Sequence, residues 1–111
     1  METKCIRIRL KPGCLDQART WGTEINSRRD DALATLRDEG ITLECAFLDC
    51  TGEEAYLIYI IRGENLRHAK MVTEQSTHAI DAYHRNFKET CWAERQPLEQ
   101  LIELSLDPPI T

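Results

Sequence analysis

Two stretches of the chain alternate between apolar and polar residues, as β-strands covered on one face do. They span residues 5–10 and 41–49, and we predict a strand in each. A third run, residues 55–61, is apolar in both registers, which predicts a strand covered on both faces. We expect one set of side chains from the two alternating strands to face the helices: Ile6, Ile8, Leu10, Ile41, Leu43, Cys45 and Phe47.

The segments between these strands have helical spacing. Residues 15–39 predict one long helix, which Gly40 ends. Asn65 is a suitable N-cap for the next helix. The remaining expected elements are a hairpin loop at 50–54, a helix at 66–75, a break at 76–78, a helix at 79–91, a last strand at 97–106 and a frayed tail at 107–109.

The predicted order β-α-β-β-α-β is that of the ferredoxin-like α+β fold, a four-stranded antiparallel sheet with the helices on one face. We expect residues 1–111 to form a single domain of this kind. The opposite face would combine Arg7, Arg9 and Glu44 with half of the apolar strand 55–61. A second copy could cover that face, so we expect a homodimer through the open sheet face. The alternative is a monomer with a solvated, ion-paired sheet.

Composition narrows the classes of function. The formal charge of -5, with acids and bases interspersed, argues against a nucleic-acid-binding protein. The longest apolar run is too short to span a membrane, and the first residues lack a signal-peptide pattern. Five cysteines without a Cys-x-x-Cys pair argue against a disulfide framework and a zinc knuckle. We therefore expect a cytoplasmic protein with free thiols.

Three segments carry a resemblance: residues 9–13 (RLKPG), 35–40 (TLRDEG) and 76–84 (STHAIDAYH). They resemble a family of small uncharacterised bacterial proteins, a domain of unknown function, and more distantly the dimeric α+β barrel superfamily. The resemblance implies a ferredoxin-like dimer with a cavity either between helices and sheet or within the barrel. That superfamily includes cofactor-independent monooxygenases, isomerases, haem-degrading enzymes and ligand-binding modules, so the resemblance implies no single reaction.

The helix expected at 79–91 places a histidine, His84, inside an apolar stripe. Asp81 precedes His84 by three residues, a spacing at which the two side chains can meet, and His78 precedes Asp81 by three more. An imidazole held by a carboxylate and kept neutral by burial could act as a general base. The alternative is that Asp81 caps the helix and His84 is a hydrogen-bonded core residue.

Arg29 projects onto the apolar stripe of the helix expected at 15–39, between Ile25 and Leu33. A guanidinium in that position needs a partner, such as Glu44, Asp81 or the carboxylate of a substrate. As an anion clamp it could be assisted by Arg28 or Arg9; alternatively, it forms a structural bridge or extends to solvent. Aromatic residues could line a pocket or belong to the core: Trp21, Tyr56, Tyr59, Tyr83 and Trp92.

A metal site is a weaker hypothesis, because His78 and His84 would need a kink near Thr77 and further ligands from Glu44, His68 or a cysteine. We expect neither a metal nor a cofactor. The first functional hypothesis is a homodimer that binds a small acidic or aromatic compound. In it, His84 could act as the base of a cofactor-independent isomerase or monooxygenase, with Asp81 orienting it and Arg29 holding the substrate. The second is a ligand-binding or regulatory module without catalysis.

Overall fold

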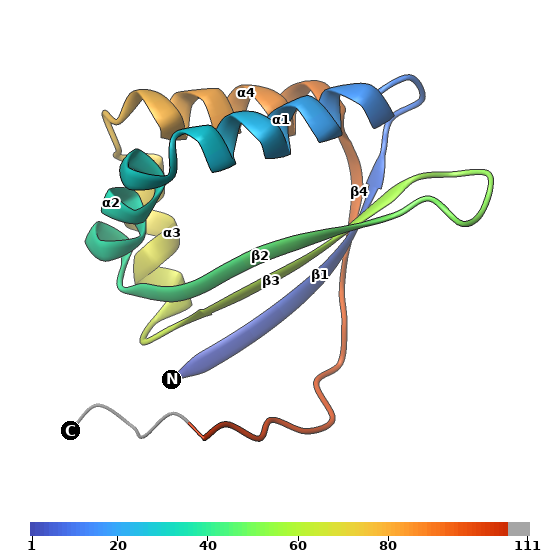
Figure 1. The fold of residues 1–111 in the computed structure, drawn as a ribbon. Helices are drawn as coiled ribbons and strands as arrows, with labels where there is room; N and C mark the ends of the chain where they lie inside the picture. Colours follow the sequence, from blue (N-terminus) through green and yellow to red (C-terminus); the bar gives the residue numbers. More distant parts are fainter. Residues whose placement is uncertain (107–111) are drawn as a thin grey trace.

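The strands and helices follow the predicted order, except that the helix predicted over residues 15–39 is divided into two (Figure 1). A computed structural model describes residues 1–106 of the chain; the tail expected at 107–109 lies outside the described residues. The elements are β1 (Glu2–Leu10), α1 (Leu15–Ser27), α2 (Arg29–Glu39), β2 (Ile41–Asp49), β3 (Tyr56–Gly63), α3 (Leu66–Glu74), α4 (Ala79–Cys91) and β4 (Trp92–Pro97).

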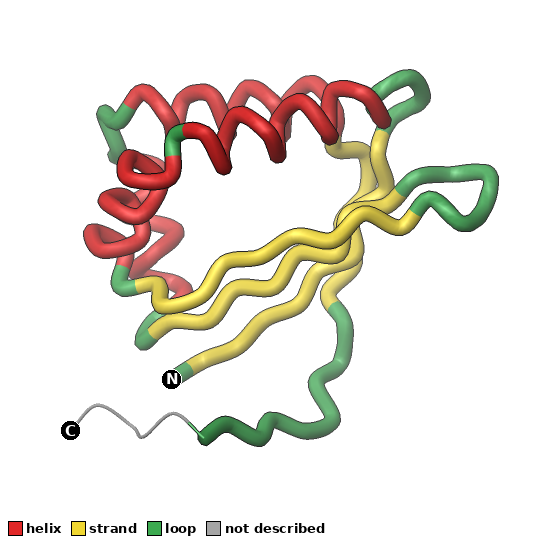
Figure 2. The backbone as a smooth tube through the Cα atoms, viewed as in Figure 1, coloured by secondary structure: helices red, strands yellow, loops and turns green. Residues whose placement is uncertain are grey.

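The four strands form one antiparallel sheet in the order β2-β3-β1-β4, which is the ferredoxin-like topology that the sequence predicted. All four helices lie on the same side of the sheet (Figure 2). Helix α1 packs against α4 and runs over the sheet, whereas α2 packs against α3 at one end of it (Figure 1). We call the side of the sheet away from the helices the open face.

The core lies between the sheet and the pair α1 and α4. Ile8 and Leu10 are buried there and Ile6 packs against them, so the predicted orientation of β1 is confirmed. Burying such aliphatic side chains contributes about 1.5–3 kcal/mol each to folding. The other buried members of this cluster are Cys14, Ala18, Trp21, Leu57, Tyr59, Phe87 and Cys91.

The prediction of one helix over residues 15–39 was wrong, because the helix breaks at Arg28. Arg28 has φ −109° and ψ 40°, outside the helical region. Just before it, the hydroxyl of Ser27 donates to the carbonyl of Glu24 and so competes with the helical backbone bonds. The break changes the helix direction, so the single stripe that was expected to run through Arg29 does not exist. Gly40 ends α2 in the left-handed conformation, as predicted.

The predicted orientation of β2 was also wrong beyond its first residue. Ile41 faces the helices, but an irregularity between Ile41 and Leu43 inserts an extra residue relative to β3. Because successive side chains of a strand point to opposite faces, one extra residue inverts every later position. Glu44, Ala46 and Leu48 therefore face the helices, as their partners Ile61, Tyr59 and Leu57 do. Leu43, Cys45 and Phe47 lie on the open face.

The last strand is Trp92–Pro97, not the predicted 97–106. It follows α4 directly and pairs with β1 from Leu10 to Ile6. It therefore occupies the position beside β1 in which the strand predicted at 97–106 would have paired. Residues 98–106 continue outside the sheet with exposed side chains. The hairpin loop, the N-cap at Asn65 and the break at 76–78 are confirmed. Within residues 1–106, no helix combines the length and apolar character that crossing a membrane requires.

Candidate functional site

A cleft of about 540 Å³ opens between the helices and the sheet. Its size is that of pockets that hold small molecules, which span roughly 300–1,000 Å³. All four helices and all four strands contribute side chains to its lining. The lining residues with polar or aromatic chemistry include Trp21, Arg29, Glu39, Glu44, Tyr59, Lys70, Asp81, His84, Lys88, Trp92 and Arg95.

Four rings form one wall of this cleft, which we call the aromatic wall: Trp21, Tyr59, His84 and Trp92. The His84 ring lies 5.5 Å from Trp21, 6.1 Å from Tyr59 and 6.2 Å from Trp92, measured between ring centres. Ring centres at 4.5–7 Å are the spacing of favourable aromatic contacts. The wall therefore offers a preformed surface on which a planar molecule can lie.

His84 is neutral in this setting. Burial and the charges of Lys88, Arg85 and Arg95 lower its pKa to about 3. The Nε1–H of Trp21 donates to its Nδ1 at 3.1 Å, which assigns the remaining proton to Nε2. His84 is consequently a hydrogen-bond donor through Nε2, and a weak base.

Carboxyl groups from three elements line the cleft, on α2, β2 and α4. Glu44 on β2 accepts a hydrogen bond from the hydroxyl of Tyr59. Desolvation, and then the charge of Asp81, raises the pKa of Glu44 to about 7. Desolvation, Glu44 and Asp81 likewise raise the pKa of Glu39, at the end of α2, to about 7. Both groups can gain or lose a proton near neutral pH, as acid–base chemistry requires.

Two cations lie over the ring of Trp92. The Lys88 Nζ is 5.2 Å and the Arg95 guanidinium carbon 4.7 Å from the ring centre. Desolvation, followed by the nearby charge of Arg95, lowers the pKa of Lys88. Among residues 1–106 neither cation forms a salt bridge. The Nε1–H of Trp92 itself is buried and has no hydrogen-bond acceptor within the same part of the chain.

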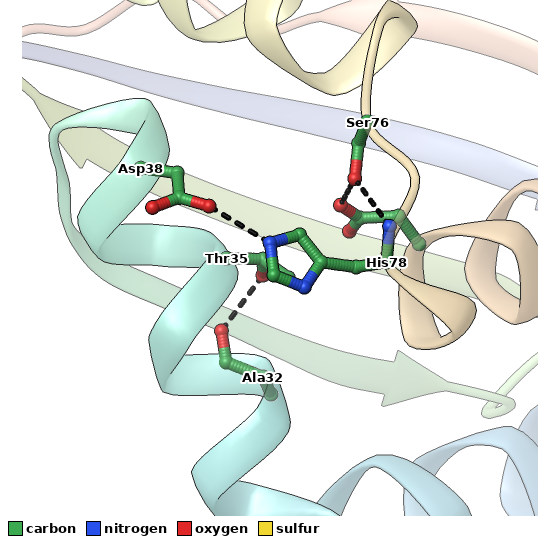
Figure 3. A network of polar contacts seen from close by, with 6 residues as sticks. Ala32, Thr35, Asp38, Ser76 and His78 are labelled. Carbon is green, nitrogen blue, oxygen red and sulfur yellow. Dashed lines mark hydrogen bonds and ion pairs between the residues drawn. The ribbon is translucent and has the colours of Figure 1, made fainter.

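The structure gives Asp81 a different partner from the predicted His84. Its carboxylate is buried and accepts a hydrogen bond from the Ser76 hydroxyl at 2.5 Å, and this hydroxyl also accepts from the backbone N–H of His78 (Figure 3). Asp81 lies in the first turn of α4, where its carboxylate does not cap the helix but binds the Ser76 hydroxyl, and it lines the cleft.

His78 lies outside the cleft lining, on the exposed side of the turn before α4. Its Nε2 is 2.8 Å from a carboxylate oxygen of Asp38 on α2 (Figure 3). The hydrogen bond to Asp38 raises the pKa of His78. This ion pair connects α2 to the start of α4. His78 is therefore held outside the cleft that His84 lines.

The predicted binding residues are divided between several locations. Arg29 lines the cleft but is exposed at the start of α2, not inserted into an apolar stripe. Glu44 lines the cleft as described above. Arg9 lies on the open face, 3.1 Å from Glu94 and 4.0 Å from Glu54, away from the cleft. Tyr83 packs against the core and is not among the cleft residues.

Sequence reasoning missed Glu39, Lys88 and Arg95. Lys88 follows His84 by four residues, so helical spacing alone places both on one face of α4. Arg95 had no such signal, because it faces the cleft only through its pairing with Ile8. Glu39 could not be predicted as a cleft residue, because its position depends on α2 being a separate helix with its own direction. Within residues 1–106, no three His, Cys, Asp or Glu side chains gather in a geometry suited to a metal ion.

Comparison with known proteins places the chain in a family without assigning an activity. No curated protein matches the sequence significantly. Residues 1–110 match the model of one protein family, which is described as "Family of unknown function (DUF6176)". Because that match covers nearly the whole chain, the protein belongs to this family of unknown function, DUF6176.

Proposed function

We propose that this protein binds a small planar acid in the cleft. The ring of the ligand would lie on the aromatic wall, and its carboxylate would lie near Lys88 and Arg95. The observation that carries the proposal is the pair of cations over Trp92, neither of which forms a salt bridge within residues 1–106. The charge of Glu44 acts on Lys88 only beyond salt-bridge distance. An anion between them would offset the desolvation and the repulsion from Arg95 that together lower the pKa of Lys88. It could also accept from the unpaired Trp92 indole after a small side-chain shift.

The acid–base groups of the cleft suit proton transfer on such a ligand. Glu44 is the better base, because its pKa is about 7 whereas that of His84 is about 3. In this proposal the Glu44 carboxylate removes a proton from a carbon next to a carbonyl and returns it at another position. His84 donates its Nε2–H to the oxygen that becomes negative, as a neutral imidazole can. The step is an isomerisation with no net oxidation.

Intrinsic fluorescence tests the binding part directly, because both tryptophans of the chain belong to the aromatic wall. We expect benzoate to change the emission in a saturable manner and uncharged benzamide to bind about tenfold more weakly or not at all. Lys88→Gln and Arg95→Gln should each weaken benzoate binding by about tenfold.

The matched control is Arg67→Gln, which removes a cation from the exposed side of α3 outside the cleft. This variant should bind benzoate as the wild type does. The binding proposal fails if benzoate gives no saturable change, or if Arg67→Gln weakens it as much as Lys88→Gln does.

Catalysis is tested separately by hydrogen exchange in D₂O with phenylpyruvate, an aromatic keto acid with a proton next to its carbonyl. We expect the wild type to accelerate loss of that proton signal in NMR spectra. Glu44→Gln should abolish the acceleration, and the exposed Glu74→Gln should retain it. Benzoate binding without accelerated exchange would identify the alternative, a non-catalytic ligand-binding module, in which Trp21 holds His84 for stability alone.

Two coarser inferences accompany this proposal. The ferredoxin-like topology and the partly apolar open face support our placement of the family within the dimeric α+β barrel superfamily. All five cysteines are free thiols, which supports a reducing, cytoplasmic location. Both inferences are independent of the identity of the ligand.

A further inference from the structure

Residues 98–106, which we call the C-terminal segment, carry apolar side chains that residues 1–106 leave largely exposed. Ile102, Leu104 and Leu106 are 77%, 90% and 103% exposed. These three residues alternate with Glu103 and Ser105, so an extended chain presents them on one side. A row of exposed aliphatic side chains gains free energy only by covering another apolar surface.

The open face of the sheet is a second uncovered apolar surface. Phe47 is 61% exposed there and pairs with Ile58 of β3. In the next row, Ile60 lies between Cys45 of β2 and Cys5 of β1. Apolar side chains therefore extend across three neighbouring strands on the side of the sheet that the helices leave uncovered.

The segment is tied to its own chain in a position that leaves its side chains in water. The backbone N–H of Leu98 donates to the carbonyl of Cys5 at 2.9 Å, and the hydroxyl of Thr3 donates to Glu103. These contacts hold the segment beside β1 while it runs along the side of the sheet away from the helices (Figure 1). The two apolar surfaces of one chain consequently do not cover each other.

The dimensions and charges of the segment suit the open face. Nine extended residues reach roughly 30 Å, whereas four strands span only about 15 Å across a sheet. The segment carries Glu99 and Glu103 and no basic residue, and the open face presents Arg7. Every chain carries both surfaces, so two copies related by a two-fold axis can make two identical contacts.

We propose that the protein is a homodimer in which the C-terminal segment of each chain lies across the open sheet face of the other. The segment acts as an arm that embraces the partner. This contact explains why the predicted strand 97–106 has the alternation of a strand although it pairs with no strand of its own sheet. It also covers the second face of β3, which the sequence pattern of residues 55–61 requires.

Light scattering coupled to size-exclusion chromatography tests the proposal on the full chain. We expect the wild type to have twice the mass of one chain. Phe47→Lys and Ile102→Lys should each raise the dissociation constant of the dimer by at least about tenfold. The control is Met71→Lys, because Met71 is also an apolar residue with a similar exposure, 55%, and lies on α3, away from both surfaces. It should remain dimeric, and circular dichroism should show all three variants folded.

Mixing the two dissociated variants tests the exchange of segments. The Phe47→Lys chain keeps an intact segment and the Ile102→Lys chain keeps an intact open face, so a mixture restores one of the two contacts. We expect a heterodimer that is weaker than the wild-type dimer and tighter than either variant alone. A monomeric wild type, a dimer that Ile102→Lys leaves intact, or a mixture that stays monomeric would each overturn the proposal.

Discussion

The indole N–H of Trp21 donates to Nδ1 of His84 across 3.1 Å, which joins α1 to α4 beside the cleft. Protonation of Nδ1 would break this bond and place a charge beside Lys88 and Arg95. The contact therefore holds the imidazole neutral and directs its Nε2–H away from Trp21. This relationship changes the role that the sequence suggested for His84, from base to donor.

His84 should make the protein sensitive to acid. Its pKa is about 3 in the folded state and about 6.5 when unfolded, so the unfolded chain takes up the proton first as the pH falls. Stability from this group is present above about pH 6.5 and is lost progressively toward about pH 3. In urea denaturation at several pH values, His84→Leu should lose less stability on acidification than the wild type. An equal loss in both proteins would contradict this prediction, and the exposed His68→Leu serves as the control.

Glu44 should have the opposite pH dependence. Its folded pKa of about 7 lies above its ordinary value of 4.5, so its contribution to stability is present below about pH 4.5 and is lost as the pH rises through about 7. Glu44→Gln removes the ionisation but keeps an acceptor for Tyr59. We expect its thermal midpoint relative to wild type to be higher at about pH 8 than at about pH 5. The same measurement on exposed Glu74→Gln should show no such trend; a matching trend there would refute the assignment to Glu44.

The ion pair between His78 and Asp38 predicts a measurable titration. Asp38 raises the pKa of His78, so the pair stabilises the protein below the unfolded pKa of about 6.5 and less as the pH rises through the folded value. Asp38→Asn should lower the pKa of His78 in an NMR titration of its ring protons. Asp30→Asn, about two helical turns from Asp38 in α2, should leave it nearly unchanged. A His78 titration that is the same in wild type and Asp38→Asn would show that the pair does not form in solution.

Gly63 is expected to be intolerant of a side chain. A Cβ there would lie 2.8 Å from the carbonyl oxygen of Gly40 and 2.8 Å from a methyl group of Ile41, so the turn between α2 and β2 would have to shift. We expect Gly63→Ala to cost about 1–3 kcal/mol in denaturant unfolding. Gly22→Ala is the control, because its Cβ would meet nothing within 4 Å inside α1. That change should be neutral or stabilise by up to about 1 kcal/mol, and equal losses in the two variants would be inconsistent with the packing described.

Part of the candidate site was within reach of the sequence. His84 belongs to the cleft because the stripe of α4 is a local pattern, and Glu44, which the sequence offered as a partner for Arg29, also lines the cleft. The sheet face predicted for Glu44 was wrong, because its strand was placed in the wrong register. Lys88 was accessible through the same helical spacing as His84. Arg95 was not, because its position depends on which residue of β1 it pairs with.

The sequence by itself determined the order and type of the elements, the fold class and the helix-facing side of β1, because periods of two and 3.6 residues are local properties of the chain. Only the tertiary structure decided the break at Arg28, the extra residue between Ile41 and Leu43, and the occupation of the sheet edge by Trp92–Pro97. Each depends on distant backbone partners. A change of one residue in register exchanges the two faces of a strand. Phe47 therefore lies on the open face and Glu44 in the cleft, the reverse of the prediction.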